Sequence, residues 1–273
     1  MYICTGDVAQ LGERLNGIQE AKSSILFIST RNFSRLYVQA AFFISEPERV
    51  AMRPDMRIDD DVCACCPECR LGWITYEAVP REDDAAVSAA MEALLPSLKS
   101  RLDSMPLADM PNLGESRRGY RACGKDPGRW RVSSEALYRR VRQGKALYRI
   151  NSVVDVNNLV SLETGFSLGT YDRDHLEGGV VLRRGLTGES YPGIGKDAVD
   201  LEHMPLLADA AGPVGSPTSD STRAMVTAES RRFLTVIYSF SSRAELERAL
   251  TLAAGRFRTL AGALNMEYGV VER

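Results

Sequence analysis

The sequence predicts an α+β fold, in which helices pack on a mixed, mostly antiparallel sheet within one domain. Two segments are typical of strands: Leu71–Val79, which alternates between apolar and polar residues, and the apolar run FLTVIYSF over residues 233–240. Residues 85–102 and 245–264 have apolar side chains at the three- and four-residue spacing of an amphipathic helix. A chain of 273 residues is long enough for one large domain or two small ones.

Composition and charge narrow the class of protein. Hydrophobic residues make up 44% of the chain and charged residues 26%, as in ordinary globular proteins. With a net charge of -2, any surface that binds nucleic acid must be a local basic patch. No apolar run approaches the ~20 residues that a membrane span needs. We therefore expect a cytoplasmic protein with no membrane partner.

The first 55 residues differ in character from the rest. They show no sustained helical or strand period, and they resemble the spurious translation of an upstream transfer-RNA gene. We expect residues 1–55 to be an extension without a fold of its own, with Met52 and Met56 as candidate starts, and residues 56–273 to be the single domain. The alternative is a natural extension with a short hairpin or helix around residues 33–44.

A group of four cysteines near the start of this domain admits a zinc site. Such a site usually needs a second ligand pair at loop distance, but only Cys123 lies downstream, and His175 and His203 are far away in sequence. Reduced cysteines also serve as small apolar residues. We expect no metal and no cofactor, with a metal-dependent enzyme kept as an alternative. The four residues are Cys63, Cys65, Cys66 and Cys69.

Capping residues locate the first helices. Asp83 and Asp84 are N-cap candidates for the helix over residues 85–102, in which Pro96 predicts a kink. Ser134 is the N-cap candidate for a second helix over residues 135–150.

This second helix is basic and is the predicted RNA-binding element. Most basic amphipathic helices are simply solvated, so that alternative stays open. The same choice applies to the three arginines of the sequence GESRRGYRACG, which begins at Gly114. The RNA-binding candidates are Arg139, Arg140, Arg142, Lys145 and Arg149.

The segment NSVVDVNNLVSLETG, from Asn151 to Gly165, is the centre of the predicted site. Its valines, Val153–Val156, are expected to begin a strand, and Asn157 and Asn158 favour a turn or a helix start. A short buried helical turn follows, and Gly165 ends it. Polar side chains among apolar elements are what a small-molecule or RNA-end pocket needs.

Later loops add polar groups to this segment. Gly178 and Gly179 are expected to form a tight turn into the strand Val180–Arg184, and Asp209 to close another turn. The sequence PGIGK lacks the spacing of a phosphate-binding P-loop. Polar residues cluster again over residues 216–223.

An ordered set of sequences gives the chain a family resemblance. These are DPGRW, SSEALYRRV, GKALYRINSVVDVNNLVSLETG, GTYD, VVLRR, GES, GIGK and SPTSDSTR. From about Met56 to Asn265 the chain resembles the B3/B4 domain, the editing and tRNA-binding module of the phenylalanyl-tRNA synthetase beta subunit, in its free-standing form. The resemblance implies the same α+β fold and excludes a complete phenylalanine-tRNA ligase, because the other modules of the subunit are absent.

The resemblance also implies a role in aminoacyl-tRNA quality control. The embedded domain hydrolyses tyrosine wrongly attached to the phenylalanine tRNA, since an aromatic pocket rejects an added hydroxyl only ~100-fold. Two family positions differ here: Gly169 stands at the place of a His, and Thr218 at the place of a Glu. We therefore keep two hypotheses: an editing hydrolase that acts in trans, and a non-catalytic module that binds RNA or an amino acid.

The candidate site residues come from several segments. In the hydrolase hypothesis, an amide or hydroxyl holds the carbonyl and a carboxylate orients water. The catalytic candidates are Asn157, Glu163, Asp172, Thr218 and Asp220. The substrate-binding candidates are Asn158, Ser161, Tyr171, Glu189, Gly193 and Ser216. The expected partner is the aminoacylated 3′ end of a tRNA, not DNA, and the oligomeric state stays open.

Each candidate also has an ordinary structural explanation. Asn157 would cap a helix, Asp172 would close a turn, Asp220 would pair with Arg223, and Glu163 would be a solvated surface carboxylate. The functional hypothesis requires that side chains from three distant segments converge on one cleft.

Overall fold

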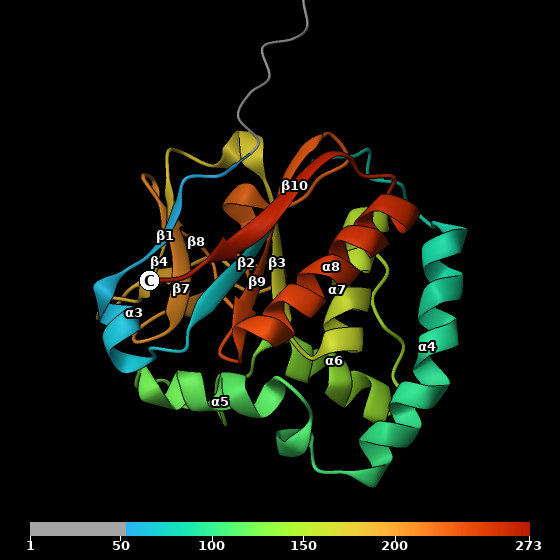
Figure 1. Cartoon of the computed structure of the whole chain (residues 1–273), viewed down its shortest axis with the longest axis horizontal. Coiled ribbons are helices and arrows are strands. Elements are labelled where there is room, and N and C mark those ends of the chain that lie inside the picture. Colours follow the sequence, from blue (N-terminus) through green and yellow to red (C-terminus); the bar gives the residue numbers. More distant parts are fainter. Residues whose placement is uncertain (1–52) are drawn as a thin grey trace, which may run out of the picture. The chain divides into compact units, whose positions relative to one another are not determined.

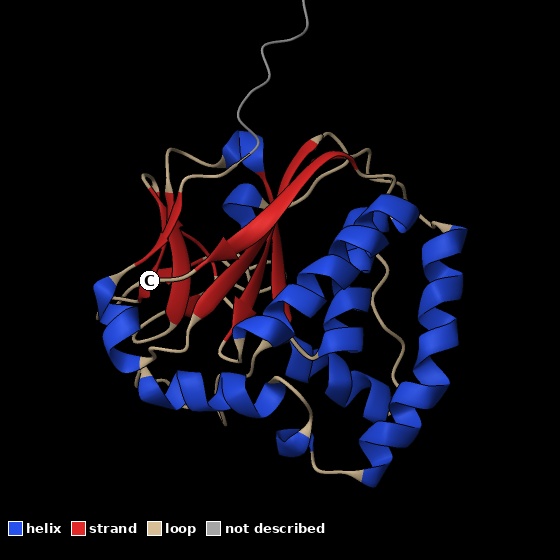
Figure 2. Ribbon diagram, in the orientation of Figure 1, coloured by secondary structure: helices blue, strands red, loops and turns tan. Residues whose placement is uncertain are grey.

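The computed structural model describes residues 53–273, so the expectations for residues 1–52 lie outside the described residues. A central sheet separates a group of helices from a smaller sheet (Figure 1, Figure 2). This arrangement confirms the α+β fold. No helix within residues 53–273 is long and apolar enough to cross a membrane.

The central sheet has four antiparallel strands in the order β10-β2-β9-β3. Both strands predicted from their apolar pattern lie at its centre, as β2 and β9. The sheet comprises β2 (Arg70–Glu77), β3 (Ser167–Asp172), β9 (Arg232–Ser239) and β10 (Leu264–Val271).

The smaller sheet has the order β1-β4-β7-β8. Its β1 pairs with β4 in parallel and its other pairs are antiparallel, which confirms a mixed, mostly antiparallel fold. The strand β4 and the turn closed by Asp209, which accepts a hydrogen bond from Ala211 N at 2.9 Å, are confirmed. Before β4 the chain makes a bend at Gly178, with φ 69°, and not the expected tight turn. The strands are β1 (Met56–Ile58), β4 (Val180–Arg184), β7 (Pro205–Asp209) and β8 (Gly212–Gly215), with the separate pair β5 (Ser190–Tyr191) and β6 (Val199–Asp200).

Helices cover one side of the central sheet (Figure 2). α7 packs against α8 and β3, and α8 packs against β2, so that Val156, Phe233 and Phe257 share one core. Burying such side chains contributes ~1.5–3 kcal/mol each. The helices are α3 (Asp60–Cys65), α4 (Ala85–Ser104), α5 (Leu113–Ala122), α6 (Ser133–Arg142), α7 (Ser152–Thr164) and α8 (Arg243–Leu260), with the 3-10 turns η2 (Leu107–Asp109), η3 (Arg173–His175) and η4 (Thr222–Ala224).

Two predicted helix starts have different outcomes. Asp84 caps α4, accepting hydrogen bonds from Ala86 N and Val87 N. The prediction for Ser134 is wrong: the N-cap of α6 is Val132, and Ser134 is buried within the helix, where its hydroxyl lies 3.1 Å from Ser167 Oγ. A serine that finds a tertiary partner is not free to cap.

The predicted strand at the valines of residues 153–156 is also wrong. These residues lie inside α7, because Asn151 caps that helix and accepts hydrogen bonds from Val153 N and Val154 N. Gly165 ends the helix with φ 79°, as predicted. Asn157 and Asn158 therefore lie in mid-helix, not at a turn or helix start.

Two helix ends also differ from the prediction. α6 ends at Arg142, so Lys145 and Arg149 lie in the irregular segment that follows it. α8 ends at Leu260, and residues 264–271 form the strand β10. The sequence pattern did not separate these elements because apolar residues continue through both boundaries.

Candidate functional site

A buried carboxyl group at the junction of the two sheets accepts a hydrogen bond from one tyrosine hydroxyl, which in turn contacts a second tyrosine. Tyr171 Oη donates to Asp220 Oδ1 at 2.7 Å and lies 2.7 Å from Tyr238 Oη. Ser216 N donates to the same carboxylate oxygen at 3.3 Å. We call Asp220, Tyr171, Tyr238 and Ser216 the Asp220 cluster. It joins β3 and β9 to the loop after β8.

Two glycines make room for this cluster. A Cβ at Gly169 would lie 2.2 Å from Tyr171 Oη, and one at Gly215 would lie 2.1 Å from the same oxygen. Real Cβ atoms do not approach that closely, so the phenol of Tyr171 occupies space that any larger residue at these positions would need. Glycine at position 169, which stands at the place of the family His, therefore leaves the space that the phenol of Tyr171 occupies.

The surroundings of Asp220 favour its neutral form. Desolvation by burial raises the pKa of Asp220 to about 7, while hydrogen bonds from Tyr171 and Ser216 N act in the opposite direction. Burial also raises the pKa of Tyr171 and of Tyr238 well above the usual tyrosine value. Part of the Asp220 residue is exposed, but its carboxyl group lies among rings that are 1% exposed. The cluster therefore contains one group that titrates near neutral pH.

Further polar groups fix the loop that carries Asp220. Tyr120 Oη lies 2.8 Å from Thr218 Oγ1, and Tyr191 Oη donates to Ser216 Oγ at 3.2 Å. Gly193 lies beside the same loop, in a bridge with Ser221. Five of the predicted site residues are therefore near one another: Tyr171, Gly193, Ser216, Thr218 and Asp220.

The predicted residues of α7 are not part of this group. Thr170, which points to the opposite face of β3 from Tyr171, donates to Asn157 Oδ1 at 3.0 Å and lies 2.8 Å from Thr235 Oγ1. Asn157 Nδ2 also donates to Leu168 O at 3.4 Å. Asn157, Asn158 and Ser161 thus belong to the helix that covers the other side of the sheet.

Three predicted carboxylates have partners of their own. Asp172 accepts a hydrogen bond from Ser230 Oγ at 2.6 Å at the end of β3, and its other oxygen caps η3. Arg256 Nε donates to Glu163 at 3.1 Å, so Glu163 is not the free surface carboxylate of the alternative explanation. Glu189 pairs with Arg183, and this partner lowers the pKa of Glu189.

The structure therefore brings only part of the predicted site together. Asn158, Asp172 and Thr218 lie on separate parts of the fold, which departs from the expected single cleft. The alternative explanation for Asp220 is also wrong, because Arg223 pairs with Asp209 at 2.7 Å. Sequence reasoning missed Tyr238; the available signal was a tyrosine in a buried strand, whose hydroxyl needs a partner.

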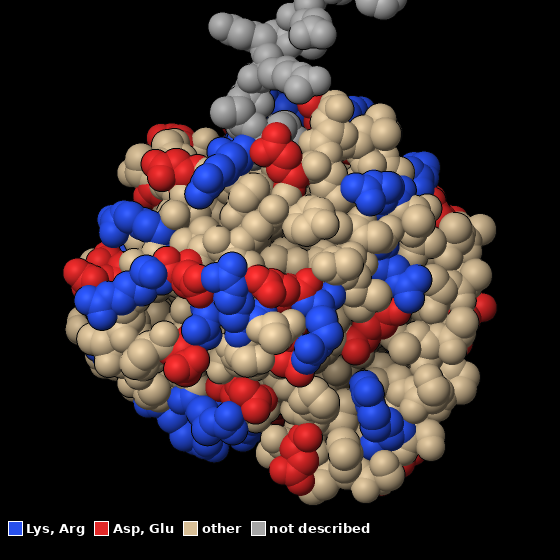
Figure 3. All heavy atoms as spheres, viewed as in Figure 1, with Lys and Arg blue, Asp and Glu red and all other residues tan. Residues whose placement is uncertain are grey.

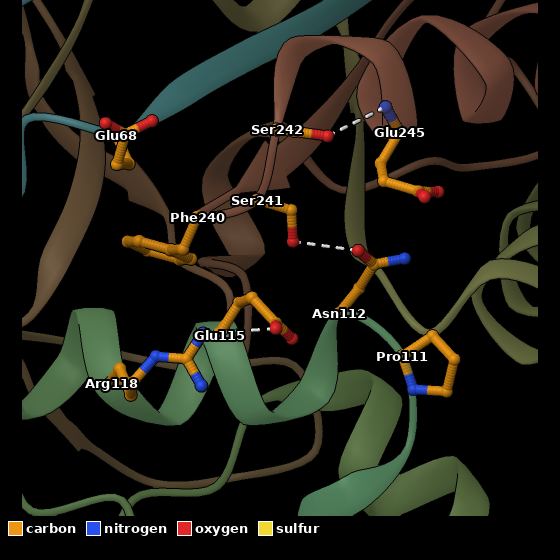
Figure 4. Close-up of a pocket in the computed structure, with 9 residues that line it drawn as sticks. All are labelled: Glu68, Pro111, Asn112, Glu115, Arg118, Phe240, Ser241, Ser242 and Glu245. Carbon is orange, nitrogen blue, oxygen red and sulfur yellow. Dashed lines mark hydrogen bonds and ion pairs between the residues drawn. The ribbon is translucent and has the colours of Figure 1, made fainter.

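Two hollows on the described surface lie away from the Asp220 cluster. The one in Figure 4 has a volume of about 430 Å³ and lies where α5 and α8 begin. Asn112 and Ser241 at its base bond to one another at 2.8 Å, and Arg118 at its rim pairs with Glu115. None of the predicted site residues lines it.

A second hollow, of about 560 Å³, is lined by arginines from two helices. Arg117 Nη1 of α5 and Arg139 Nη2 of α6 donate to the two oxygens of Glu135, at 2.7 and 2.8 Å. Arg142 lines the same hollow, is exposed and has no ion pair within residues 53–273. Two carboxylates line the hollow with these three arginines: Glu135, which Arg117 and Arg139 hold, and Asp103, which pairs with Lys99 at 2.6 Å. We call this hollow the arginine groove.

The segment after α6 carries an exposed aromatic ring beside the other basic candidates. Tyr148 is 66% exposed, and the guanidinium of Arg140 lies 4.1 Å above its ring. Arg140 also donates to Ala146 O and to Tyr148 Oη, which fixes this segment on α6. Lys145 is exposed and unpaired in the described part of the chain, whereas Arg149 pairs with Asp155 at 3.2 Å.

Basic and acidic side chains are interspersed on the face of the molecule in Figure 3. On this face, Lys and Arg alternate with Asp and Glu and form no continuous basic field.

The cysteines near the start of the domain are the potential metal ligands of the metal-dependent alternative. Within residues 53–273, no group of three or more His, Cys, Asp or Glu side chains is arranged to hold a metal ion.

Comparison with known proteins identifies the family. A family model for the B3/4 domain matches residues 115–257, which is more than half of the chain. The chain belongs to the B3/4 domain family. The resemblance expected from the sequence is therefore confirmed. The Asp220 cluster, the basic helix α6 and the three arginines of the arginine groove lie within the matched B3/4 region, whereas the other wall of the groove, residues 103–108, lies before it.

Curated relatives of this B3/4 protein are phenylalanine–tRNA ligase beta subunits. That of Symbiobacterium thermophilum is 40% identical over 67 residues, covering 24% of this chain and 8% of that protein. That of Chromobacterium violaceum is 31% identical over 107 residues, covering 37% and 13%. The matches span about a tenth of the length of these relatives.

A solved structure was also found. It is an N-terminal fragment of the phenylalanyl-tRNA synthetase beta subunit from Pyrococcus horikoshii, with a TM-score of 0.41 and 11% identity. The alignment covers 78% of this chain and 50% of that chain.

Proposed function

We propose that this B3/4 protein binds tRNA, and that the arginine groove and the segment after α6 grip its backbone and an unpaired base. The observation that carries the proposal is that Arg117, Arg139 and Arg142 line one hollow. Its two carboxylates already have partners, Glu135 in Arg117 and Arg139, and Asp103 in Lys99, so Arg142 is left for a phosphate. Guanidinium groups bind phosphate oxygens through paired, charge-assisted hydrogen bonds. The beta-subunit relatives make tRNA the expected nucleic acid.

The charge of the surrounding segment supports this proposal. Residues 117–149 contain eleven Lys or Arg but only two acidic residues, Asp126 and Glu135, in a chain whose net charge is -2. The exposed basic residues of this segment supply the sequence-independent part of RNA affinity. Lys125 is not one of them, because it is buried and pairs with Asp200. Tyr148 adds an exposed ring, and exposed rings beside arginines stack on unpaired bases.

The experiment is a binding titration of the full chain with tRNA over a range of salt concentrations. Arg142→Ala is expected to weaken binding and to make the salt dependence shallower by about one phosphate contact. Arg248→Ala is the matched control, because Arg248 is an exposed arginine on α8 whose partner is Glu245. Equal affinity and salt slope for wild type and Arg142→Ala would refute the groove as the RNA site.

A second candidate function is hydrolysis of mischarged aminoacyl-tRNA in trans. The observation that favours it is the Asp220 cluster, where a carboxyl with a pKa of about 7 is suited to general acid–base catalysis. The catalytic and substrate-binding candidates from the sequence remain proposals within this function. Gly169 and Thr218, at the places of the family His and Glu, favour the binding function over hydrolysis.

A deacylation assay separates the two functions. Wild type and Asp220→Asn are incubated with a panel of mischarged tRNAs, and release of the amino acid is measured. The hydrolase function predicts two results. The wild-type chain releases at least one amino acid faster than the uncatalysed rate, and Asp220→Asn loses this activity while its affinity for tRNA is unchanged. Normal tRNA binding without release across the panel supports the binding function.

We also propose that residues 56–273 form a single domain. The family match ends before β10 and begins after β2, but both strands belong to the same sheet as β3 and β9.

A further inference from the structure

Two cysteines outside the Asp220 cluster and the arginine groove lie unusually close together. Cys65 Sγ, at the end of α3, is 2.8 Å from Cys123 Sγ, which follows α5, although the two residues are 58 positions apart. We propose that Cys65 and Cys123 form an oxidisable dithiol, at which a peroxide converts two thiols into one disulfide.

The geometry is suited to this reaction. The sulfurs of a disulfide are ~2.05 Å apart, so the two thiols need to approach by less than ~1 Å. Their long separation along the chain means that a bond would tie α3 to the end of α5, the helix that supplies Arg117 to the arginine groove.

The two thiols differ in access. Cys65 is partly exposed, whereas Cys123 is 1% exposed. Burial raises the pKa of Cys123, so this thiol stays protonated and protected until its neighbour reacts. Cys65 is therefore the peroxide-reactive residue, and Cys123 is the resolving residue.

The reaction balances with hydrogen peroxide as the oxidant. Cys65 thiolate attacks one peroxide oxygen, the O–O bond breaks, and hydroxide leaves, which gives a sulfenic acid. Cys123 Sγ then attacks Cys65 Sγ; the S–S bond forms, the S–O bond breaks, and water leaves with the Cys123 proton. In total two thiols lose two electrons and two protons, and one peroxide becomes two waters.

The remaining described cysteines of this region are protected from peroxide. Burial raises the pKa of Cys66 to about 11 and also raises that of Cys69, so both thiols stay protonated and do not compete with Cys65. Within residues 53–273, no three potential ligands are arranged around one point.

The test starts from the fully reduced chain, freed of reductant and treated with hydrogen peroxide. We expect the loss of two free thiols, a peptide pair that joins Cys65 to Cys123 in a non-reducing digest, and full recovery with dithiothreitol. The oxidised chain should also melt at a higher temperature, by ~4 °C or more, because a long loop is closed.

Variants provide the controls. Cys63→Ala removes a buried cysteine of the same helix and should leave both thiol loss and the linked peptides unchanged. Cys65→Ser and Cys123→Ser should each abolish the linked peptides. Three results would each overturn the proposal: a Cys66–Cys69 link, oxidation to sulfinic acid without a link, or a stoichiometric zinc ion in the reduced chain. The digest of the wild-type chain distinguishes these outcomes even if a variant fails to fold.

Discussion

The two faces of β3 carry polar networks of different kinds. On the helix side, Thr170 bonds to Asn157 and Thr235, and all these groups are neutral at ordinary pH. On the other side, Tyr171 bonds to Asp220 and Tyr238, so one partner is a carboxyl that titrates. Adjacent residues of one strand thus face a fixed network and an ionisable one.

The difference shows which side of the sheet can respond to its surroundings. A neutral network of hydroxyl and amide groups holds α7 on the sheet and has the same energy across the physiological pH range. A carboxyl held among phenols changes the energy of the folded state whenever it gains or loses a proton. The glycines Gly169 and Gly215 lie only on the ionisable side, where they admit the phenol of Tyr171.

The largest expected effect is a pH dependence of stability that comes from Asp220. Its pKa in the folded state, about 7, lies above the unfolded value of ~3.9, so the folded state retains the proton longer. The stabilisation is complete below pH ~4 and is lost as the pH rises to 7, with a slope of up to ~1.4 kcal/mol per pH unit. Urea unfolding of wild type and Asp220→Asn at pH 5, 6, 7 and 8 checks this.

Comparing wild type with Asp220→Asn isolates the contribution of the Asp220 carboxyl group to the pH dependence of stability. Other groups titrate in both proteins, so only the difference between their unfolding free energies is informative. A difference that is constant from pH 5 to pH 7 would show that Asp220 ionises in the folded state as it does in water.

A second effect comes from the space beside Tyr171. Gly169→Ala places a Cβ 2.2 Å from Tyr171 Oη and should lower the free energy of unfolding by about 3 kcal/mol. Gly255→Ala, in α8 with nothing within 4 Å, is the matched control and should raise it by up to ~1 kcal/mol. Equal unfolding midpoints for the two variants would contradict the tight fit of the phenol.

A pair of near-isosteric changes compares the two networks directly. Tyr171→Phe leaves Asp220 and Tyr238 without a hydroxyl partner and should cost ~1–3 kcal/mol. Thr170→Val removes bonds to neutral groups only and should cost ~1 kcal/mol, with no change in pH dependence. Denaturation at two pH values measures both; a pH-dependent cost for Thr170→Val would mean that the networks are coupled through the strand.

The smallest effect concerns the two asparagines of α7. Asn157→Ala loses the bonds to Thr170 and Leu168 and should lower stability by ~1 kcal/mol. Asn158→Ala should change it by less than ~0.5 kcal/mol, because Asn158 is partly exposed and alanine favours helix. If Asn158→Ala is the more damaging variant, its side chain has a role that packing does not explain.

The sequence predicted the fold better than the site. The β2 and β9 segments and α4 had clear periods, and the family resemblance supplied the rest of the α+β arrangement. The valines before Asn157 were misread because a short apolar run with β-branched residues suits either a strand or a buried helix. The N-cap residue Asn151 makes this run a helix. Asparagine is equally common in turns, so its presence did not distinguish a helix start from a turn.

The site depended on contacts that local sequence does not encode. Ser216, Thr218 and Asp220 were grouped correctly because they are near one another along the chain. Tyr238 joined them only through the register that places β9 beside β3, where it faces Ser167. Asn157 was grouped with Thr218 and Asp220, but it lies on α7, which covers the opposite face of β3, where it contacts Thr170.

The strand order of the central sheet also determines where this protein can be cut. A fragment limited to residues 115–257 would keep β9 beside β3 but lose β2 and β10 from its other side. The row of backbone groups on β9 that pairs with β2 over eight residues would then face water. The unpaired edge of β9 could then pair with the same edge of a second copy. The excised fragment should therefore aggregate more readily than the intact chain.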